Sequence, residues 1–338
     1  GGFVINGQCA GDSSSMGLSN AGDINGDGLA DVIVGAPSSS RAAGVNVGAG
    51  YVVYGKSSTA AIDLSAVADG VGGFVINGAT SSDQSSFSVA GAGDVNGDGL
   101  ADLVVGAPNV SFGVNTRNGS SYVIFGGTTG TFIQSAVDWL GTSGDDTRAA
   151  TATGQTLVGA AGNDTLSANG ATVLQGGAGD DTFVLDSGMR TALTTNGLSS
   201  GVLARVDGGS GLDTIKLSGT GLTLDFTQIA NQAAGDLEGG SRISSVERID
   251  LTGAGNNTLK LMARDVLDMS GFNQFVTTGL HQFLVKADTG DVIDLADATG
   301  TTGWTHAADT VIGGLAYQTW NHNTQLATLY VDLNGQVI

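Results

Sequence analysis

The sequence is short of the residues that cross-link a fold, stop its helices or give it positive charge. The chain of 338 residues has one cysteine, two prolines and 12 lysines and arginines. The single Cys9 excludes an internal disulfide framework. No cluster of Lys or Arg is present to release phosphate counterions, so nucleic acid and anionic membranes are not expected as partners. No run of 18 apolar residues occurs, so we expect no transmembrane segment.

Glycine and aspartate are abundant instead. Glycine accounts for 57 residues, and the 32 acidic residues comprise 30 Asp and two Glu, which gives a net charge of −20. Glycine without a three-residue period excludes collagen. Short carboxylates among glycines are typical of turns and calcium loops. We therefore expect an all-β protein with many turns.

An internal repeat organises the N-terminal part of the chain. Gly2–Gly7 returns as Gly73–Gly78, and Gly35–Pro37 returns at the same offset as Gly106–Pro108. Short β-branched runs separated by Gly, Ser and Asn indicate several strands in each copy. Four-stranded units of this size are typical of propeller blades. The repeat predicts a domain over residues 1–136, with units at 1–71 and 72–136.

Each unit carries a nine-residue loop that suits one hard cation. Oxygen side chains stand at loop positions 1, 3, 5 and 9, glycine stands at position 6, and the carbonyl of position 7 completes the shell. We predict calcium, because magnesium prefers fewer protein ligands; the alternative is an Asx-rich turn without metal. The predicted ligands are Asp23, Asn25, Asp27, Leu29 and Asp31 in the first loop, and Asp94, Asn96, Asp98, Leu100 and Asp102 in the second.

These residues resemble the FG-GAP repeat of integrin α-subunit propellers and of many bacterial surface proteins. The resemblance covers about residues 1–136 and includes Phe87–Val89, Gly35–Pro37 and Gly106–Pro108. It implies calcium in both loops. Propellers of this family close with about seven blades, within the general range for propellers. Two blades therefore imply either further repeats upstream or pairing with another chain.

A second kind of repeat begins near residue 137. Its loops begin at Gly141, Gly159, Gly176 and Gly208, and they carry Asp146, Asp164, Asp181 and Asp213. The first three aspartates follow one another at a nearly constant interval, which predicts a flattened coil with turns about 4.8 Å apart. An ion between consecutive loops would take ligands from both. The 32 residues from Asp181 to Asp213 are not a multiple of the interval of about 18 residues, which predicts that the fourth loop lies off the stack.

These loops look like the nonapeptide repeat of RTX proteins, Gly-Gly-x-Gly-x-Asp-x-apolar-x. The resemblance covers about residues 141–216 and is weakest in the first loop, where Arg148 replaces the apolar residue. It implies a parallel β-roll over residues 137–218, with calcium held by the four aspartates and by Gly141, Gly159 and Gly176. A β-coil that has lost calcium is the alternative.

Residues 219–338 carry no metal motif and are expected to form a β-rich domain with short helices at 226–232 and 263–269. The run Glu247–Gly253 resembles the C-terminal region of large RTX adhesins. That resemblance implies type I secretion through an uncleaved C-terminal signal.

The motifs favour a structural function over catalysis, because each specific one binds metal. We expect a secreted, calcium-dependent adhesive or structural protein of the cell surface or extracellular matrix, not an enzyme, with an extracellular or host-surface ligand that the sequence does not identify. Self-association into a filament or layer is expected, because two blades leave a sheet edge without a partner. The alternative is the calcium-binding and secretion portion of a secreted hydrolase whose catalytic domain lies upstream.

Overall fold

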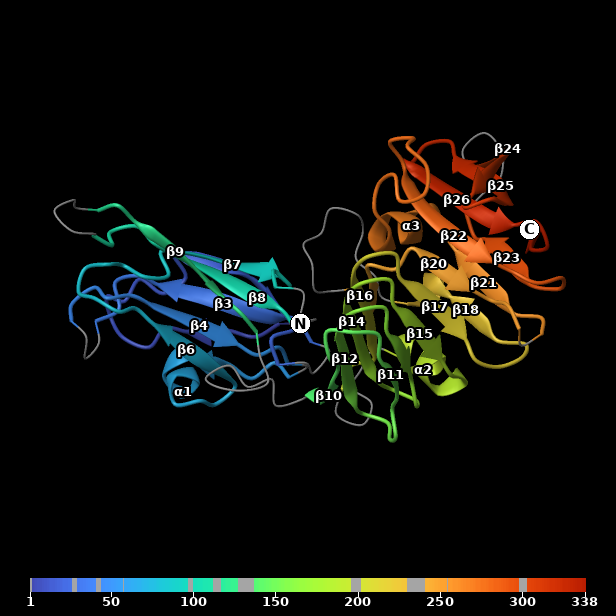
Figure 1. Cartoon of the computed structure of the whole chain (residues 1–338). Helices are drawn as coiled ribbons and strands as arrows, with labels where there is room; N and C mark the ends of the chain where they lie inside the picture. The colour runs from blue at the N-terminus through green and yellow to red at the C-terminus, as the bar shows by residue number, and fades with distance from the viewer. Residues whose placement is uncertain are drawn as a thin grey trace. The chain divides into compact units, whose positions relative to one another are not determined.

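The chain folds as two units, in which nearly all regular structure is β-strand. A computed structural model describes residues 2–25, 29–40, 44–56, 58–96, 100–111, 117–126, 137–195, 202–229, 241–253, 255–297 and 303–338. The N-terminal unit consists mainly of residues 1–135 and the C-terminal unit mainly of residues 136–338 (Figure 1). The expectation of a mainly β protein is confirmed.

The N-terminal unit contains two antiparallel sheets and one short parallel pair. The first sheet has the order β2 (Gly17–Gly22), β3 (Asp31–Ala36), β4 (Ala49–Val53), β6 (Gly73–Asn77). The second has the order β7 (Ser88–Gly93), β8 (Asp102–Ala107), β9 (Ser120–Ile124). The pair is β1 (Ile5–Asn6) with β5 (Ile62–Asp63), and α1 (Leu64–Ala68) follows it.

The internal repeat of the sequence reappears in the strand register of these sheets. Val34 pairs with Tyr51 between β3 and β4, and Val105 pairs with Tyr122 between β8 and β9. The fourth strand of the first sheet, β6, belongs to the second repeat in sequence. Among the described strands neither sheet closes on itself, so the propeller stays a prediction.

The two sheets share a core. Ile33 and Val52 from the first sheet cluster with Leu103 and Val105 from the second, and all four are at most 1% exposed. The other face of the first sheet packs on α1 through Leu64.

The C-terminal unit is a coil in which successive strands alternate between parallel sheets (Figure 1). One sheet is β10 (Val137–Leu140), β12 (Thr156–Ala161), β14 (Val173–Ala178), β16 (Arg205–Ser210), β19 (Ile243–Ser244). Another is β11 (Thr147–Ala149), β13 (Thr165–Ser167), β15 (Thr182–Leu185), β17 (Thr214–Leu217), β20 (Arg248–Asp250), β22 (His281–Lys286), β26 (Ala327–Asp332), ending in antiparallel β25 (Leu315–His322) and β24 (Trp304–Ile312). The last is β18 (Thr223–Asp225), β21 (Thr258–Leu261), β23 (Val292–Leu295), β27 (Gln336–Val337).

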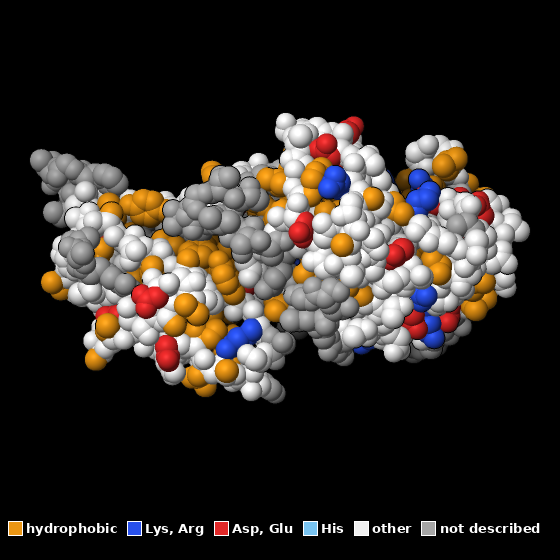
Figure 2. Space-filling model, turned by 90° about the horizontal axis from the view of Figure 1, so that it is seen from below, with side chains coloured by type: hydrophobic (Ala, Val, Ile, Leu, Met, Phe, Trp, Pro, Cys, Tyr) orange, Lys and Arg blue, Asp and Glu red, His pale blue; other side chains and the backbone are white. Residues whose placement is uncertain are grey.

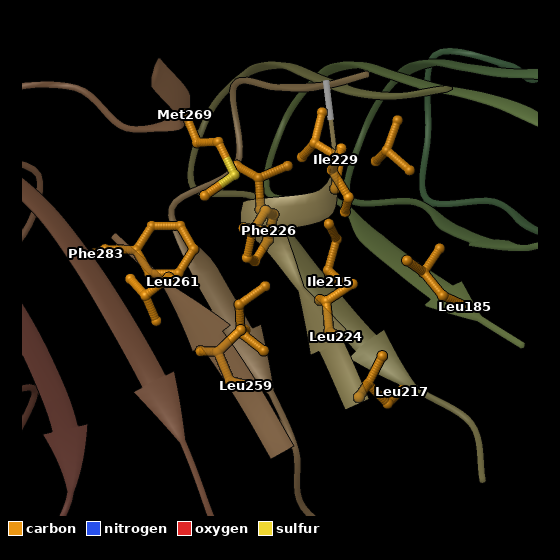
Figure 3. Packing of buried hydrophobic residues seen from close by; sticks show 14 of the residues in the cluster. Leu185, Ile215, Leu217, Leu224, Phe226, Ile229, Leu259, Leu261, Met269 and Phe283 are labelled. Carbon is orange, nitrogen blue, oxygen red and sulfur yellow. The ribbon is translucent and has the colours of Figure 1, made fainter. Parts of the chain in front are cut away.

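Apolar side chains fill the inside of the coil. Leu166, Phe183 and Ile215 follow their aspartate loops, pair in register and are fully buried. Farther along the coil, side chains from β17, β18, β21 and β22 pack together in one cluster (Figure 3). Arg148 pairs with Leu166 on the first strand of its sheet and is exposed beside the ring of Trp139, which explains why a charged residue is tolerated there.

The prediction that the fourth loop lies off the stack is wrong. Gly177 pairs with Gly209 and Thr182 pairs with Thr214, so the loop at Gly208 lies directly against the loop at Gly176. The additional residues include α2 (Ser187–Leu193), which follows β15. A coil turn can therefore lengthen beyond the loop without changing the register at the loop edge.

The two predicted helices differ in outcome. Residues 263–269 form α3 (Ala263–Met269), as predicted. In the other segment the structure shows only the 3-10 turn η1 (Phe226–Gln228), and residues 230–232 lie outside the described part. Across residues 218 and 219 the sheet continues, because β17 pairs with β20.

Candidate functional site

Five acidic side chains line one edge of the coil and form what we call the carboxylate ladder. Its members are Asp146, Asp164, Asp181, Asp213 and Glu247. Each backbone amide donates to the carboxylate of the next member: Asp146 N to Asp164 Oδ1 (2.7 Å), Asp164 N to Asp181 Oδ1 (2.8 Å), Asp181 N to Asp213 Oδ1 (2.8 Å), Asp213 N to Glu247 Oε2 (2.9 Å). The structure thus brings the four predicted aspartates of the coil into one row.

The second carboxylate oxygen of the central members has no hydrogen-bond donor within the described residues. Asp164, Asp181 and Asp213 are each 1% exposed, and the Oδ2 atom of each is buried with no hydrogen-bond partner in the described part of the chain. Burying a carboxylate oxygen without a partner costs free energy, and a bound cation or a proton would remove that cost.

A column of glycines faces these unpaired oxygens. A Cβ atom added at Gly176 would lie 2.1 Å from Asp181 Oδ2 and 2.5 Å from the carbonyl oxygen of Gly208 on the next turn. Gly159 stands in the same relation to Asp164 Oδ2 and the carbonyl of Gly176, at 2.3 and 2.5 Å. Carboxylate and carbonyl oxygens from successive turns therefore converge beside each glycine.

The electrostatics of the ladder follow burial. Burial raises the pKa of Asp213 to about 8 and that of Asp181 to about 7, and neighbouring carboxylates add to both shifts. Burial also raises the pKa of Asp164. At the exposed end, the backbone amide and hydroxyl of Thr142 donate to Asp146 and lower its pKa. Negative charge is therefore unfavourable in the middle of the ladder and favourable at its first member.

Glu247 ends the ladder and was not predicted from the sequence. Its turn is shorter than the Gly-rich loop before it, because the segment from Asp207 to Thr214 pairs at its two ends with Ser244 and Arg248. The longer side chain of Glu247 reaches the amide of Asp213. Burial raises the pKa of Glu247 to about 7, although the adjacent Arg248 acts in the opposite direction. Arg248 also donates to the carbonyl of Leu212 (3.2 Å) and lies 3.8 Å from Asp180. A fixed cation thus stands where the row of loops ends.

A second, outer row of side chains holds the loops together. Asn163 N donates to Asp145 Oδ1 (2.8 Å), Asp180 N to Asn163 Oδ1 (2.7 Å), and Leu212 N to Asp180 Oδ1 (3.0 Å). These bonds run in the opposite direction to those of the ladder. The residue before each ladder aspartate therefore fixes the spacing between turns.

In the repeat loops of the N-terminal unit, the position 9 aspartates have a clear structural role. Asp31 accepts from Ile24 N through Oδ2 and from Gly55 N through Oδ1, at 2.7 Å each. Asp102 accepts in the same way from Val95 N and Gly126 N, also at 2.7 Å. Both aspartates are 0% exposed. Each ties the start of its loop to the residues that follow the third strand of the repeat.

The other predicted loop residues are placed unevenly. Asp23 and Asn25 are buried at the first loop, whereas Asp94 and Asn96 are exposed at the second. Leu29 is partly buried and Leu100 is buried. Asp27 and Asp98 lie outside the described residues, so the complete ligand set of neither loop is seen.

Within the described residues, no group of three or more His, Cys, Asp or Glu side chains converges as a metal cluster. The carboxylate ladder explains this, because it places one carboxylate on each turn in a line. A cation held there would need backbone carbonyls as further ligands. Among the helices that the structure describes, none is long and apolar enough to cross a membrane.

Comparison with known proteins bears on the N-terminal unit. The FG-GAP repeat model matches residues 18–53 and 87–124. Phosphatidylinositol-glycan-specific phospholipase D is 38% identical over 109 residues in Mus musculus, covering 32% of this chain and 12% of that protein. The corresponding proteins of Rattus norvegicus and Homo sapiens are 39% and 36% identical over 109 residues, which is 13% of each.

The chain therefore contains two FG-GAP repeats, and it spans about an eighth of the length of the curated relatives it matches. FG-GAP repeats are typical of extracellular and cell-surface proteins, which agrees with the predicted setting.

Proposed function

We propose that this chain is a calcium-dependent structural or adhesive part of a secreted cell-surface or extracellular-matrix protein, and that the carboxylate ladder is its main calcium site. The observation that carries the proposal is the row of three buried Oδ2 atoms, on Asp164, Asp181 and Asp213, that have no donor among the described residues. Calcium takes six to eight oxygen ligands, including carboxylates and backbone carbonyls. The ladder and the glycine column supply both kinds.

The residues that would hold each ion come from two successive turns. Asp181 and Asp213 supply carboxylate oxygens, and Gly176 and Gly208 belong to the loops whose carbonyls face them. Each inner aspartate is shared, because it lies between two neighbouring turns. Bound calcium supplies the positive charge that the buried carboxylates lack, so its binding free energy adds to folding free energy.

The FG-GAP loops extend the proposal to the N-terminal unit. In these loops Asp31 and Asp102 hold the backbone, and they remain proposed ligands together with the other oxygen side chains of each loop. Low calcium inside the cell would leave the coil loose for export by type I secretion, and millimolar calcium outside would order it.

Circular dichroism with and without calcium tests this function. We expect the full chain in EDTA to lose part of its β signal and to regain it when calcium, but not magnesium, is added. A matched variant with Asn at residues 164, 181 and 213 should lose the calcium response of the C-terminal unit. Full structure in EDTA with no response to calcium would contradict the proposal.

A second candidate is that the chain is the non-catalytic part of a secreted hydrolase. The partial similarity to phosphatidylinositol-glycan-specific phospholipase D supports it. Assay of the intact gene product for hydrolysis separates the two candidates, because a purely structural protein would show no turnover.

A further inference from the structure

The outer edge of β9 is less covered than the equivalent strand of the first repeat. In β4, Tyr51 and Val52 are 0% exposed, because β6 pairs along that strand while α1 and the second sheet cover its two faces. In β9, the equivalent Tyr122 and Val123 are 45% and 49% exposed. Within the described residues β9 is an edge strand. An exposed apolar edge of this kind is a template for another strand.

The strand that covers β4 has a second copy in the same chain. β6 begins the run Gly73–Gly78, which is identical in sequence to Gly2–Gly7. The described sheet that holds β1 has two strands, so one of its edges carries no further strand there. Val4 is 62% exposed. Residues 2–6 thus have the sequence of an edge-covering strand and a free edge with which to act as one.

The backbone conformation of Gly2 is independent evidence that residues 2–6 can pair as β6 does. Gly73 has a φ of +151°, and a Cβ atom there would lie 2.0 Å from the carbonyl oxygen of Val52 on β4. Gly2 has a φ of +153°, but a Cβ atom there would meet no atom of the described residues within 4 Å. Only glycine adopts this region readily. Gly2 therefore has the backbone conformation that Gly73 adopts beside β4, although no described strand lies beside Gly2.

We propose that residues 2–6 of one copy of this chain add to the outer edge of β9 in a second copy, in the register by which β6 adds to β4. The register of β8 with β9 equals that of β3 with β4 shifted by one repeat. The same shift therefore gives the register of residues 2–6 on β9. Val4 then lies opposite Tyr122, and Gly2 lies opposite Ile124, as Val75 and Gly73 lie opposite Tyr51 and Val53.

The surroundings of β9 fit the added strand. A cavity of about 250 Å³ lies beside Tyr122 and Ile124 and is also lined by Ile76 and Val105. Directly paired residues of an antiparallel sheet share a face, so the added Val4 would lie on the same side as Tyr122, next to this cavity. Other apolar side chains also reach the surface of the N-terminal unit (Figure 2). The internal repeat relates residues 2–6 to the edge of β9 and not to those side chains.

The contact joins two different surfaces, so each copy can both donate residues 2–6 and accept a strand at β9. The donor segment of the second copy stays free to add to a third. Repetition of one such contact gives a ring where the rotation between copies closes and an open filament where it does not. This inference deepens the structural part of the proposed function and names its partner as a second copy of the chain.

Cysteine cross-linking tests the register directly. In a Cys9→Ser background, one chain carries Val4→Cys and another carries Tyr122→Cys. Both sites are about half exposed or more, so folding should be preserved. With oxidised glutathione as oxidant in millimolar calcium, we expect disulfide-linked dimers that contain one chain of each kind. The doubly substituted chain should give a series of multimers on a non-reducing gel.

Two controls make the outcome decisive. Val71→Cys replaces Val4→Cys as a matched donor, because Val71 is 65% exposed and lies outside the strand. The peptide Gly-Phe-Val-Ile-Asn-Gly should suppress cross-linking, and a version with proline at its second and fourth positions should not. Cross-linking no stronger than with Val71→Cys, or a disulfide only within single chains, would overturn the inference. Calcium binding by the carboxylate ladder can hold in either case, so the two proposals fail separately.

Discussion

At the scale of single residues, the two oxygens of one carboxylate have different tasks. Asp213 Oδ1 accepts from the amide of Asp181 and so fixes the distance between two turns. Asp213 Oδ2 is buried without a donor among the described residues. The hydrogen bond to Oδ1 can form whether or not a cation is bound. The buried Oδ2 makes the stability of the coil depend on a cation.

Substitution of Asp213 by Asn should therefore have opposite effects in the two calcium conditions. Asn keeps an acceptor for the amide of Asp181 but removes the charge. We expect a higher unfolding midpoint than the parent in EDTA at pH 8, and a lower midpoint in millimolar calcium. Asp309→Asn, at a half-exposed carboxylate on β24, is the control and should change neither midpoint appreciably. A parallel shift in both conditions would contradict a charge-based role for Asp213.

Asp31 shows that a predicted metal ligand can also be a structural anchor. Its two oxygens satisfy two backbone amides in a site without solvent exposure. Asp31→Ala leaves both amides without this acceptor, and each buried unsatisfied group costs about 1–3 kcal/mol. We expect faster hydrogen exchange in β3 and β4 even in EDTA, measured by mass spectrometry on the full chain. Unchanged exchange in EDTA would limit the role of Asp31 to metal binding.

At the scale of the element, the Gly-rich loops bring two columns of oxygens together. The glycine column lets carboxylates approach the neighbouring backbone, since a side chain at Gly176 would occupy the same space. The outer row from Asp145 to Leu212 then holds successive loops at one spacing.

Gly176→Ala should damage the loop edge, whereas Gly144→Ala should not. The added Cβ at Gly176 meets Asp181 Oδ2 and a backbone carbonyl, but at Gly144 it meets nothing within 4 Å. Overpacking of this kind typically costs about 1–3 kcal/mol. Thermal unfolding in calcium, followed by tryptophan fluorescence, reports this unit because Trp139, Trp304 and Trp320 all lie in it. Equal midpoints for the two variants would contradict the described loop geometry.

The pH dependence of the calcium-free coil follows from the raised pKa values. Asp181 and Asp213 have pKa values of about 7 and about 8 in the folded chain, above the ordinary value of 3.8. Folding is therefore favoured while these groups are protonated, and that stability is lost as pH rises through the folded pKa values. A pKa difference of one between the folded and unfolded chain corresponds to about 1.4 kcal/mol.

In EDTA we thus expect the unfolding midpoint of the C-terminal unit to fall between pH 5 and pH 8. In excess calcium the trend should flatten or reverse, because calcium competes with protons for the same oxygens. A midpoint in EDTA that rises over this range would contradict the placement of the buried carboxylates.

The loops were predictable from sequence, but the constant interval between aspartates did not place the last two members of the ladder. Asp146, Asp164 and Asp181 follow a near-constant period, which is enough to place them in one row. Asp213 breaks the period, because α2 and the residues after it lengthen its turn beyond the loop edge. Glu247 has no Gly-rich loop around it. Its only sequence signal is that it follows Asp213 at nearly the same interval by which Asp213 follows Asp181.

At the scale of the whole molecule, the chain has a net charge of −20 and gathers its acids in turns. Four bound calcium ions would offset about eight of those charges. The internal repeat predicted the strands of the N-terminal unit. It did not reveal that β6 completes the sheet of the preceding repeat, because strand pairing across a repeat boundary depends on tertiary packing.

The number of calcium ions bound tests the central claim most directly. Isothermal titration of the full chain should be compared with the variant that carries Asn at residues 164, 181 and 213. We predict that the parent binds more calcium ions than the variant, that the missing ions are those of the C-terminal unit, and that magnesium does not replace them. Equal numbers of bound ions and equal affinities in the two proteins would contradict calcium binding by the carboxylate ladder.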